Sequence, residues 1–352
     1  MLPNNSVVQL KLSICIATYN RGLFISETLD SILSQMQPGV ELIIVDGASP
    51  DNTPEVVAQY LLEHPQIHYF REPINSGVDA DFDKAVSYAR GEFCWLMGDD
   101  DLLKASAISK VLSIINSGND DLIIVNSEVM NVNLTTKLQN QRLAFDVDKI
   151  YRETDTEAIF ADIGECLSFI GCVIIRREFW LGRNRTDYYG SLFIHVGVIF
   201  QSPSITNVRV IAEPLIVIRY GNAMWTPRSF EIWMFKWPKL IWSFPDFSDS
   251  VKQKVCLREP WRSAKALFHN RALGAYTKTE FLKFYPNHIK KFDRIVAYAI
   301  SIFPASLANS VMVLFFSLRA QPAQIELYDI LHSRNAGLLS RFFAKFLVHE
   351  VN

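Results

Sequence analysis

Short apolar runs alternate with helical repeats through the first hundred residues of the chain. Residues 12–17, 42–45, 67–70 and 92–97 are mostly apolar and short, as expected of buried strands. Between these runs, apolar side chains recur every three or four residues, which is typical of one face of a helix. They are Ile25, Leu29, Ile32 and Leu33, then Val56, Val57, Tyr60 and Leu61, then Phe82, Ala85, Val86 and Ala89. The alternation predicts an α/β fold with a mainly parallel sheet flanked by helices.

A polar loop follows the first, second and fourth of these predicted strands. The three loops are Thr18–Arg21, Asp46–Asp51 and Asp99–Asp101. The carboxyl ends of parallel strands meet at one edge of an open α/β sheet, and ligands bind in the crevice there. Two strand–helix units separate Asp46 from Asp99, so we expect both residues to line one crevice.

Three consecutive carboxylates, Asp99, Asp100 and Asp101, stand at the carboxyl end of the fourth apolar run. They would repel one another unless a positive charge lay between them. Hard oxygen ligands suit Mg²⁺ or Mn²⁺, and such ions keep open positions that substrate phosphates fill. The acidic run therefore predicts a divalent cation site. The alternative is a solvated acidic turn that caps a helix beginning at Leu102.

Charge is distributed unevenly along the 352 residues. From Ser250 to the end, 15 Lys and Arg stand against 6 Asp and Glu, about +9, whereas the remaining 20 against 31 carry about −11. The chain is long enough for two domains. Its five cysteines show no paired spacing, which predicts reduced thiols and no zinc site. Residues 1–11 lack the apolar core of a secretory signal.

The C-terminal third has the composition of a mostly helical, membrane-associating region. Residues 296–318 contain no charged side chain and are long enough to span a bilayer, but a helical hairpin broken at Pro304 fits equally well. Residues 338–348 combine aromatic and aliphatic side chains with Arg341 and Lys345, as in an interfacial amphipathic helix. We expect peripheral, monotopic attachment to the cytoplasmic face of the inner membrane. An oligomer interface or a core helix is the alternative.

The order of short motifs in the first part of the chain resembles glycosyltransferase family 2, whose members have the Rossmann-like GT-A fold. The resemblance covers residues 11–125, with every landmark in the family's order. The landmarks are Ser13–Arg21, Ser31–Gln35, Glu41–Asp51, Asn75–Gly77, Ala89–Glu92 and Gly98–Asp101. Within the family, the chain is most similar to bacterial enzymes that add sugars, including dideoxyhexoses such as abequose, to lipopolysaccharide O-antigen units.

The resemblance implies transfer of a hexose or (di)deoxyhexose from a nucleotide diphosphate sugar to a saccharide, carried on polyprenyl diphosphate as an O-antigen intermediate. Nucleic acid is not an expected partner. Asp101 and Asp99 are the implied ligands of Mg²⁺ or Mn²⁺, which would stabilise the leaving diphosphate as a Lewis acid. The implied donor-binding residues are Ala17, Thr18, Asn20, Arg21, Asp46, Lys84, Asp99 and Asp100. For Lys84 a solvated helix position is the alternative, and for Asp46 a simple turn.

The residue that activates the acceptor hydroxyl is less clearly specified. Many family members have an acidic pair well after the metal site, and one carboxylate of that pair acts as the base. Here the corresponding stretch offers Asp187 and His195 as catalytic candidates. The alternatives are a buried structural histidine and an Asp187 that pairs with Arg183 or Arg185. Both an inverting and a retaining course therefore stay open.

Asn222 and Trp225 follow the apolar run 210–220, which resembles the strand that closes the family fold. Aromatic faces stack on sugar rings and amides bond hydroxyls, so these two residues are predicted to bind the acceptor. An ordinary loop is the alternative. The expected division is a GT-A domain at 1–225, with a donor half 1–125 and an acceptor half 126–225, followed by a helical region at 226–352.

Two other functions remain as alternatives. A sugar nucleotidyltransferase also uses a metal site at a sheet edge, but it would have a Gly-rich, basic phosphate loop after the first strand. Thr18–Gly22 does not supply such a loop. A non-catalytic membrane assembly protein would keep the fold as a scaffold, and its acidic run would be dispensable.

Overall fold

The computed structural model describes residues 9–285, 290–318 and 324–347, so Val348 and most of the stretch considered for a secretory signal lie outside the described residues. Contacts divide the chain into two compact units. The first contains the residues up to Val129, Asn140–Arg219 and Phe244–Val251; the second contains Met130–Gln139, Tyr220–Ser243 and the residues from Lys252 onward. The chain passes between the units several times, and one of these passages falls inside a strand, β10 (Val208–Tyr220).

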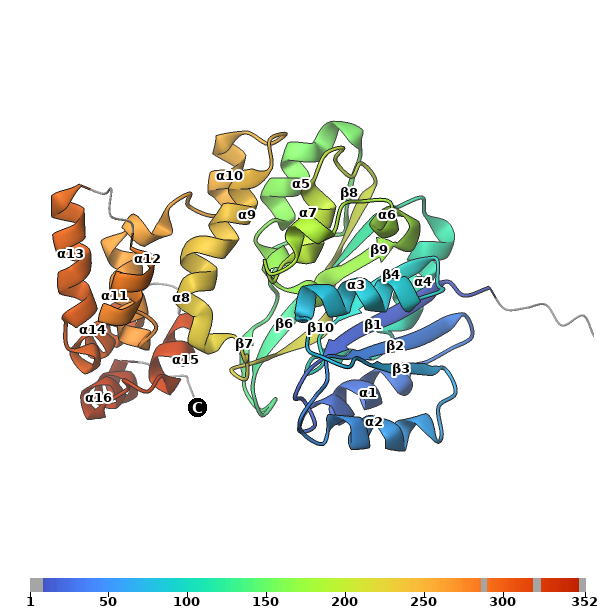
Figure 1. Ribbon diagram of the computed structural model, residues 1–352, viewed down its shortest axis with the longest axis horizontal. Helices are drawn as coiled ribbons and strands as arrows, with labels where there is room; N and C mark the ends of the chain where they lie inside the picture. Colours follow the sequence, from blue (N-terminus) through green and yellow to red (C-terminus); the bar gives the residue numbers. More distant parts are fainter. Residues whose placement is uncertain (1–8, 286–289, 319–323, 348–352) are drawn as a thin grey trace, which may run out of the picture. The chain divides into compact units, whose positions relative to one another are not determined.

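A mixed sheet forms the centre of the first unit (Figure 1). The strands are β1 (Leu12–Thr18), β2 (Val40–Asp46), β3 (Ile67–Arg71), β4 (Phe93–Met97), β5 (Leu102–Leu103), β6 (Leu122–Asn131), β7 (Lys137–Gln139), β8 (Lys149–Tyr151), β9 (Val173–Arg176) and β10. Their order is β3-β2-β1-β4-β9-β6-β10-β5, with β7 beside β6 and β8 beside β10. Strands β1 to β4 pair in parallel, whereas β9 runs antiparallel to β4 and β6. The predicted α/β class is confirmed, with parallel pairing among β1 to β4 and antiparallel pairing of β9 with both of its neighbours.

Helices flank this sheet and bury its strands (Figure 1). The helices of the first unit are α1 (Ile25–Leu33), α2 (Thr53–Leu61), α3 (Val78–Tyr88), α4 (Ala107–Ser117), α5 (Thr156–Ile163), α6 (Arg177–Leu181) and α7 (Ile194–Phe200). Every residue of β1, β2 and β4 is buried. Burial on both faces explains why these strands consist of nearly continuous apolar runs rather than alternating ones.

The predicted start of a helix at Leu102 is wrong. Leu102 and Leu103 form β5, which pairs antiparallel with Val217 and Ile216 of β10. The helix α4 begins only at Ala107. Backbone pairing with a strand over a hundred residues further along the chain therefore overrides the local helical pattern.

The register of the parallel strands brings the predicted polar loops to one edge of the sheet. Thr18 at the end of β1 pairs with Asp46 at the end of β2. On the other side of β1, Ile16 pairs with Met97, the last residue of β4. The acidic run that follows β4 therefore lies beside the end of β1, with the end of β2 as the next neighbour.

The second unit is helical. Its helices are α8 (Ser229–Glu231), α9 (Trp237–Ser243), the end of α10 (Asp249–Val255), α11 (Ala264–Leu273), α12 (Lys278–Phe284), α13 (Lys291–Ile302), α14 (Ala305–Ser317), α15 (Gln324–His332) and α16 (Leu338–Leu347). Aromatic side chains fill one core, in which Phe230 stacks on Tyr276 at 4.8 Å between ring centroids. A second core lies around α14, where Met312 and Val313 are buried.

No single helix in the described ranges is long and apolar enough to cross a membrane. Helices α13 and α14 reach the necessary length and hydropathy only together, and the pair is bent by 99° at the break between Ile302 and Ala305. Of the two arrangements predicted for residues 296–318, the structure therefore has the helical pair broken at Pro304.

Candidate active site

The acidic run lies in the turn after β4, where two of its three carboxylates are buried. Asp99 is 9% exposed and Asp101 is 4% exposed. Gly98 permits this tight turn, because a Cβ at that position would lie 2.3 Å from Asp101 Oδ2. The backbone thus holds two carboxylates close together in a setting where water screens them poorly.

Arg21 joins the loop after β1 to this acidic run. Its Nε lies 3.2 Å from Asp99 Oδ1, and its terminal nitrogen lies 3.3 Å from Asp100 Oδ2. The preceding residue, Asn20, has a φ of +58°, a conformation that asparagine tolerates better than most residues. The Asn20 amide donates to Ser49 Oγ at 2.9 Å, so the loop after β1 is also held by the loop after β2.

Arg219, near the end of β10, holds the acidic run from the other side. Its backbone amide donates to Asp101 Oδ1 at 3.0 Å, and its Nε donates to the Asp100 carbonyl at 2.9 Å. Its terminal nitrogen forms an ion pair with Glu27 of α1. Sequence analysis missed Arg219 and Glu27 because 118 residues separate Arg219 from Asp101. The available signal was an arginine directly after the apolar run 214–218.

Arg21 and Arg219 do not fully compensate the negative charge of the acidic run. Burial raises the pKa of Asp99 to about 7, the Asp100 charge adds to this effect, and Arg21 opposes it. Burial and the Asp100 charge also raise the pKa of Asp101 well above its usual value. The site therefore favours the binding of protons or of an additional cation.

Asp46 is buried at the end of β2, and both of its oxygens have partners. Oδ1 accepts from the Ser49 amide at 2.7 Å, and Oδ2 accepts from the Tyr69 hydroxyl at 2.6 Å. Asp81 of α3 lies close by, because a Cβ on Gly47 would meet its Oδ2 at 2.6 Å. Asp46 thus shapes the turn, as the simpler interpretation of the sequence held, and it stands beside a second buried acid that sequence analysis did not select.

The ammonium of Lys84 contacts side chains of its own helix, α3, and of the residues just before that helix. Nζ lies 2.7 Å from Glu72, 2.8 Å from Ser76 Oγ and 3.7 Å from Asp81. Partial burial lowers the pKa of Lys84, but the hydrogen bond to Glu72 outweighs it, and the net shift is upward. The side chain is therefore a charged member of an acidic cluster beside the loop 75–77.

The two catalytic candidates lie in different surroundings. Asp187 is exposed and accepts from Asn184 Nδ2 at 2.6 Å. Of the two arginines considered as partners of Asp187, Arg185 has its Nε 2.8 Å from Asp83, and Arg183 donates to the Val198 and Gln201 carbonyls. His195 is buried in α7, with Nε2 at 2.7 Å from the Leu167 carbonyl and Nδ1 without a hydrogen-bond partner in the described part of the chain.

The acceptor candidates Asn222 and Trp225 lie in the second unit, in the turn after β10. Trp225 is 43% exposed. Its ring contacts Trp233 edge to face, at 5.6 Å between centroids. An anchored and partly exposed indole can stack on a sugar ring, and it also suits an ordinary loop.

A family model described as glycosyl transferase family 2 matches residues 13–182, the part of the chain that holds β1 to β4 and the acidic run. The chain carries a glycosyltransferase family 2 domain. The predicted family resemblance is thereby confirmed, and the enzyme class is glycosyltransferase.

Relatives of this glycosyltransferase include two bacterial proteins. Abequosyltransferase RfbV of Salmonella typhimurium is 26% identical over 82% of this chain and 95% of its own length. The GalNAc(5)-diNAcBac-PP-undecaprenol beta-1,3-glucosyltransferase of Campylobacter jejuni is 30% identical over 31% of this chain and 35% of its own length. The first similarity extends well beyond the family domain, whereas the second is confined to about a third of each chain.

Solved structures confirm the fold of the glycosyltransferase. The crystal structure of S. aureus TarS 1-349 in complex with UDP-GlcNAc has a TM-score of 0.51 at 17% identity, and the match covers 91% of each chain. The mannosyltransferase PcManGT from Pyrobaculum calidifontis, in complex with GDP-Man and Mn²⁺, has a TM-score of 0.52 at 16% identity over 97% of this chain and 88% of that one. At these identities the matches show the fold alone.

The glycosyltransferase domain offers part of a divalent cation site. Among residues 9–285, 290–318 and 324–347, no three His, Cys, Asp or Glu side chains are placed to hold a metal by themselves. Asp99 and Asp101 do supply buried, hard oxygens, and the Thr18 side chain lies within hydrogen-bond reach of Asp99. These residues fit a cation whose remaining ligands come from a bound phosphate.

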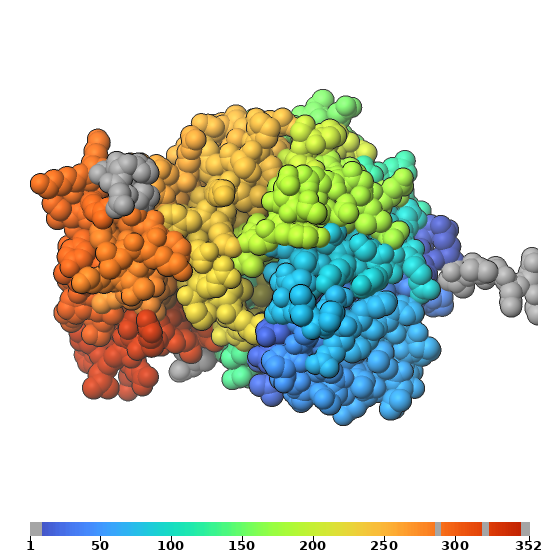
Figure 2. Space-filling model, in the orientation of Figure 1, coloured from blue at the N-terminus to red at the C-terminus, as the bar shows by residue number. Residues whose placement is uncertain are grey.

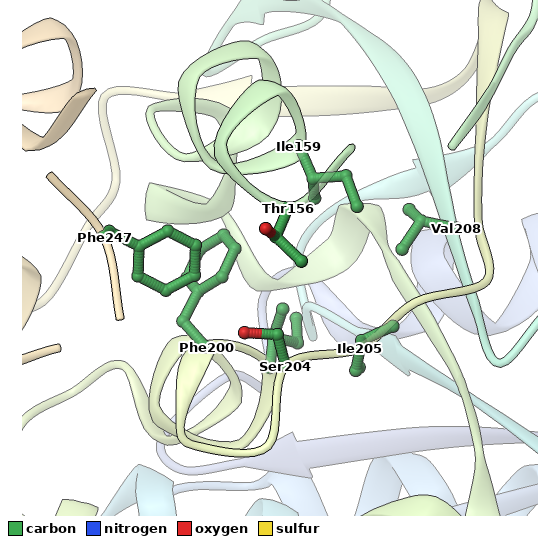
Figure 3. A pocket seen from close by; sticks show the side chains of 8 residues that line it. Thr156, Ile159, Phe200, Ser204, Ile205, Val208 and Phe247 are labelled. Carbon is green, nitrogen blue, oxygen red and sulfur yellow. The ribbon is translucent and has the colours of Figure 1, made fainter. Parts of the chain in front are cut away.

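Two cavities of the glycosyltransferase are formed without residues of the acidic run. One of about 10 Å³ in the first unit is a packing defect with room for little more than one water (Figure 3). Its lining residues are Thr156, Ile159, Ile199, Phe200, Ser204, Ile205, Val208 and Phe247. A groove of about 350 Å³ in the second unit has Trp242 and Trp261 in its wall and Lys239 at its rim. Neither contains any of the predicted donor-binding residues.

The buried imidazole of His195 makes the stability of the glycosyltransferase depend on pH. Burial lowers the pKa of His195 from 6.5 to about 4. The unfolded chain binds the proton between these values and the folded chain does not, so the folded state loses stability as the pH falls from 6.5 to 4. His195→Gln, which retains a donor for the Leu167 carbonyl, should remove about 3 kcal/mol of this loss.

Urea unfolding of both proteins at several pH values measures this difference. A gap between wild type and His195→Gln that stays constant from pH 7 to pH 4 would show that the imidazole is not held neutral. Turnover at pH 7.5 provides a separate readout, since a large loss of kcat with unchanged stability would favour the catalytic role of His195.

Proposed function

We propose that the protein is a metal-dependent glycosyltransferase that moves a hexose or (di)deoxyhexose from a nucleotide diphosphate sugar to a saccharide carried on polyprenyl diphosphate. The buried acidic run at the sheet edge is the observation that carries this proposal, because it gathers three carboxylates, two of them buried, and hard oxygens of this kind suit a divalent cation. The relative named abequosyltransferase supports the sugar class. The relative named for an undecaprenol-linked substrate supports the acceptor class.

The donor would bind across the ends of β1, β2 and β4. Breaking the bond between the anomeric carbon and the phosphate oxygen leaves extra negative charge on the diphosphate. Asp99 and Asp101 would hold Mg²⁺ or Mn²⁺, and the ion, when bound, stabilises this charge as a Lewis acid. Arg21 supplies a guanidinium that binds phosphate in a fork. The remaining proposed donor contacts are Ala17, Thr18, Asn20, Asp46, Lys84 and Asp100.

On the acceptor side, the hydroxyl oxygen bonds to the anomeric carbon and gives up its proton. Asp187 is an exposed carboxylate, and His195 has a neutral imidazole with one nitrogen unpartnered in the described part of the chain, so we propose these two as the candidates for the base. Inversion with such a base and retention with the leaving phosphate as base are both compatible with this arrangement. Asn222 and Trp225 are the proposed acceptor contacts, and a lipid-linked acceptor places the reaction at the cytoplasmic face of the inner membrane.

A thermal shift experiment tests the donor half of the proposal. Ligands that bind only the folded state stabilise it by about 2.7 kcal/mol at a concentration of 100 Kd. For a chain of 352 residues, we expect the best nucleoside diphosphate, with Mn²⁺, to raise the melting temperature by about 4 °C. The panel should include uridine, cytidine, guanosine and deoxythymidine diphosphates, each with Mn²⁺ and with EDTA.

The metal dependence of the shift is the informative comparison. We expect the shift to fall to a fraction of its size in EDTA, because the carboxylates would then repel the phosphates. Equal shifts with Mn²⁺ and EDTA would contradict metal dependence but not donor binding. The absence of a shift with any nucleotide in either condition would contradict the proposal as a whole.

A further inference from the structure

Three helices of the second unit each leave an apolar stripe exposed. The exposed side chains are Phe292, Ile295 and Ile302 on α13, Leu307, Val311 and Phe315 on α14, and Leu338, Leu339 and Phe342 on α16. On each helix the spacing places them on one face. In the space-filling view, the orange-to-red residues of the C-terminal helices form an exposed part of the surface of the second unit (Figure 2), and α14 packs against α16. Single exposed apolar residues are common, but repeated stripes mark an interaction surface.

The opposite face of α14 is fixed inside the unit by buried hydrogen bonds. Asn309 is fully buried, and its Nδ2 donates to the Ile330 carbonyl and to Ser333 Oγ, both at 2.9 Å. Its Oδ1 accepts from Ser340 Oγ of α16 at 2.5 Å. Turning the exposed stripe inward would break this network and leave an amide unsatisfied. The stripe is therefore a permanent outer surface of the fold.

The same network and the bend between the helices exclude a simple membrane span by α14. The helix has 13 residues and α13 has 12, which at 1.5 Å per residue is about 20 Å, well short of the roughly 30 Å hydrocarbon core. The 99° bend prevents the pair from acting as one rod. Helices of this length with one apolar face suit a position in the plane of a membrane surface.

Charge on the three helices selects the partner. Their residues include Lys291, Arg294, Arg341 and Lys345 but a single acid, Asp293. Cations beside an apolar stripe are attracted to anionic lipid headgroups. A second copy of the chain, by contrast, would bring the same positive charges against one another across a symmetric interface.

We infer that α13, α14 and α16 form a monotopic docking face that lies in the plane of an anionic lipid bilayer surface. The inference rests on the proposed function, because a polyprenyl-linked acceptor is presented at such a surface. It adds the location of the contact, the face of each helix that enters the bilayer boundary, and the preference for anionic lipid.

Co-sedimentation of the full chain with vesicles tests this docking face. We expect binding to vesicles of phosphatidylcholine and phosphatidylglycerol, and weaker binding to phosphatidylcholine alone. The pairs Phe292→Ser with Ile295→Ser, and Leu307→Ser with Val311→Ser, should each lower the vesicle affinity at least about tenfold. The control Leu62→Ser, which changes an even more exposed leucine of the first unit, should bind as the wild type does.

A second set of variants tests the charge. Lys291→Gln with Lys345→Gln should reduce the preference for anionic vesicles while leaving the weaker binding to neutral vesicles. Melting temperatures of all variants should match the wild type, because only exposed side chains are changed. A lowered melting temperature would identify a variant that fails to bind vesicles because it is unfolded. The other apolar pair then tests the docking face.

Three results would overturn the inference. They are no sedimentation of the wild type with either vesicle, vesicle affinities of both apolar pairs equal to the wild type, and a wild-type dimer that the apolar pairs convert to a monomer without any vesicle binding. Nucleotide-dependent thermal shifts are measured without vesicles, so failure of the docking face and failure of the proposed donor binding are distinguished.

Discussion

An Asp101→Asn variant is expected to lose about a thousandfold in kcat, the range seen when one electrostatic contact to developing charge is removed. Asparagine keeps an oxygen that can accept from the Arg219 amide, which lies 3.0 Å from Asp101 Oδ1, so the turn should persist. The variant loses the negative charge that would hold the cation and, through the cation, the departing diphosphate. Steady-state transfer of labelled sugar with saturating Mn²⁺ measures the effect.

The thermal stability of Asp101→Asn should be maintained or increased, although its kcat falls. Burial raises the pKa of Asp101, so the ionised carboxylate costs the folded state free energy at neutral pH, and the neutral amide does not bear that cost. We expect the melting temperature to be equal to or above that of the wild type. Asp146→Asn, an exposed acid of the same unit, is the matched control and should change neither quantity. Full transfer activity in Asp101→Asn would contradict the role of Asp101 as a cation ligand that catalysis needs.

The strands that position this site could be predicted because their sequence pattern is local. Parallel strands buried on both faces need continuous apolar runs, and β1, β2 and β4 have them. Polar residues that follow such runs must lie at the carboxyl edge of the sheet. The places of Thr18, Asp46 and Asp99 follow from this rule and from the strand register.

Features that depend on distant pairing could not be predicted in the same way. Leu102 and Leu103 read as the beginning of a helix, but their backbone groups pair with β10. Similarly, the assignment of residues 130–139 to the second unit and of 244–251 to the first depends on tertiary contacts rather than on composition. Local propensity is a weak guide where a segment is only two or three residues long.

The candidate site shows the same limit at the level of side chains. Residue types suitable for binding phosphate or metal were recognisable, but their partners were not. Lys84 was considered as a phosphate contact, and the structure surrounds its ammonium with Glu72, Ser76 and Asp81. The role of Arg219 could not be predicted, because no residue close to it in sequence is acidic and its contacts come from α1 and the turn after β4.

Arg219→Met is expected to lower kcat about a hundredfold, which is the cost of displacing a reacting group by about 1 Å. The substitution removes the hydrogen bond to the Asp100 carbonyl and leaves Glu27 without its arginine, although the backbone contact to Asp101 remains. The acidic turn would then lose one of its two supports. Unfolding free energy should fall by about 1–2 kcal/mol, because the partly buried Asp100 carbonyl loses its hydrogen bond, whereas Glu27 is 55% exposed and water solvates its charge. Arg219→Lys should recover little, since an ammonium cannot form the same fork.

Arg209→Met separates positioning from stability. Arg209 lies near the start of the same strand, and its Nε is 2.7 Å from Asp120, a buried acid that precedes β6. We expect this control to lose a similar free energy of unfolding, measured in urea, but to keep its kcat. Because the acceptor contacts are untouched in both variants, the acceptor KM should also stay constant. If Arg219→Met behaved like Arg209→Met, with lost stability and unchanged kcat, the arginine would support only the fold, and the geometry of the acidic run would have to be set by Gly98 and Arg21 alone.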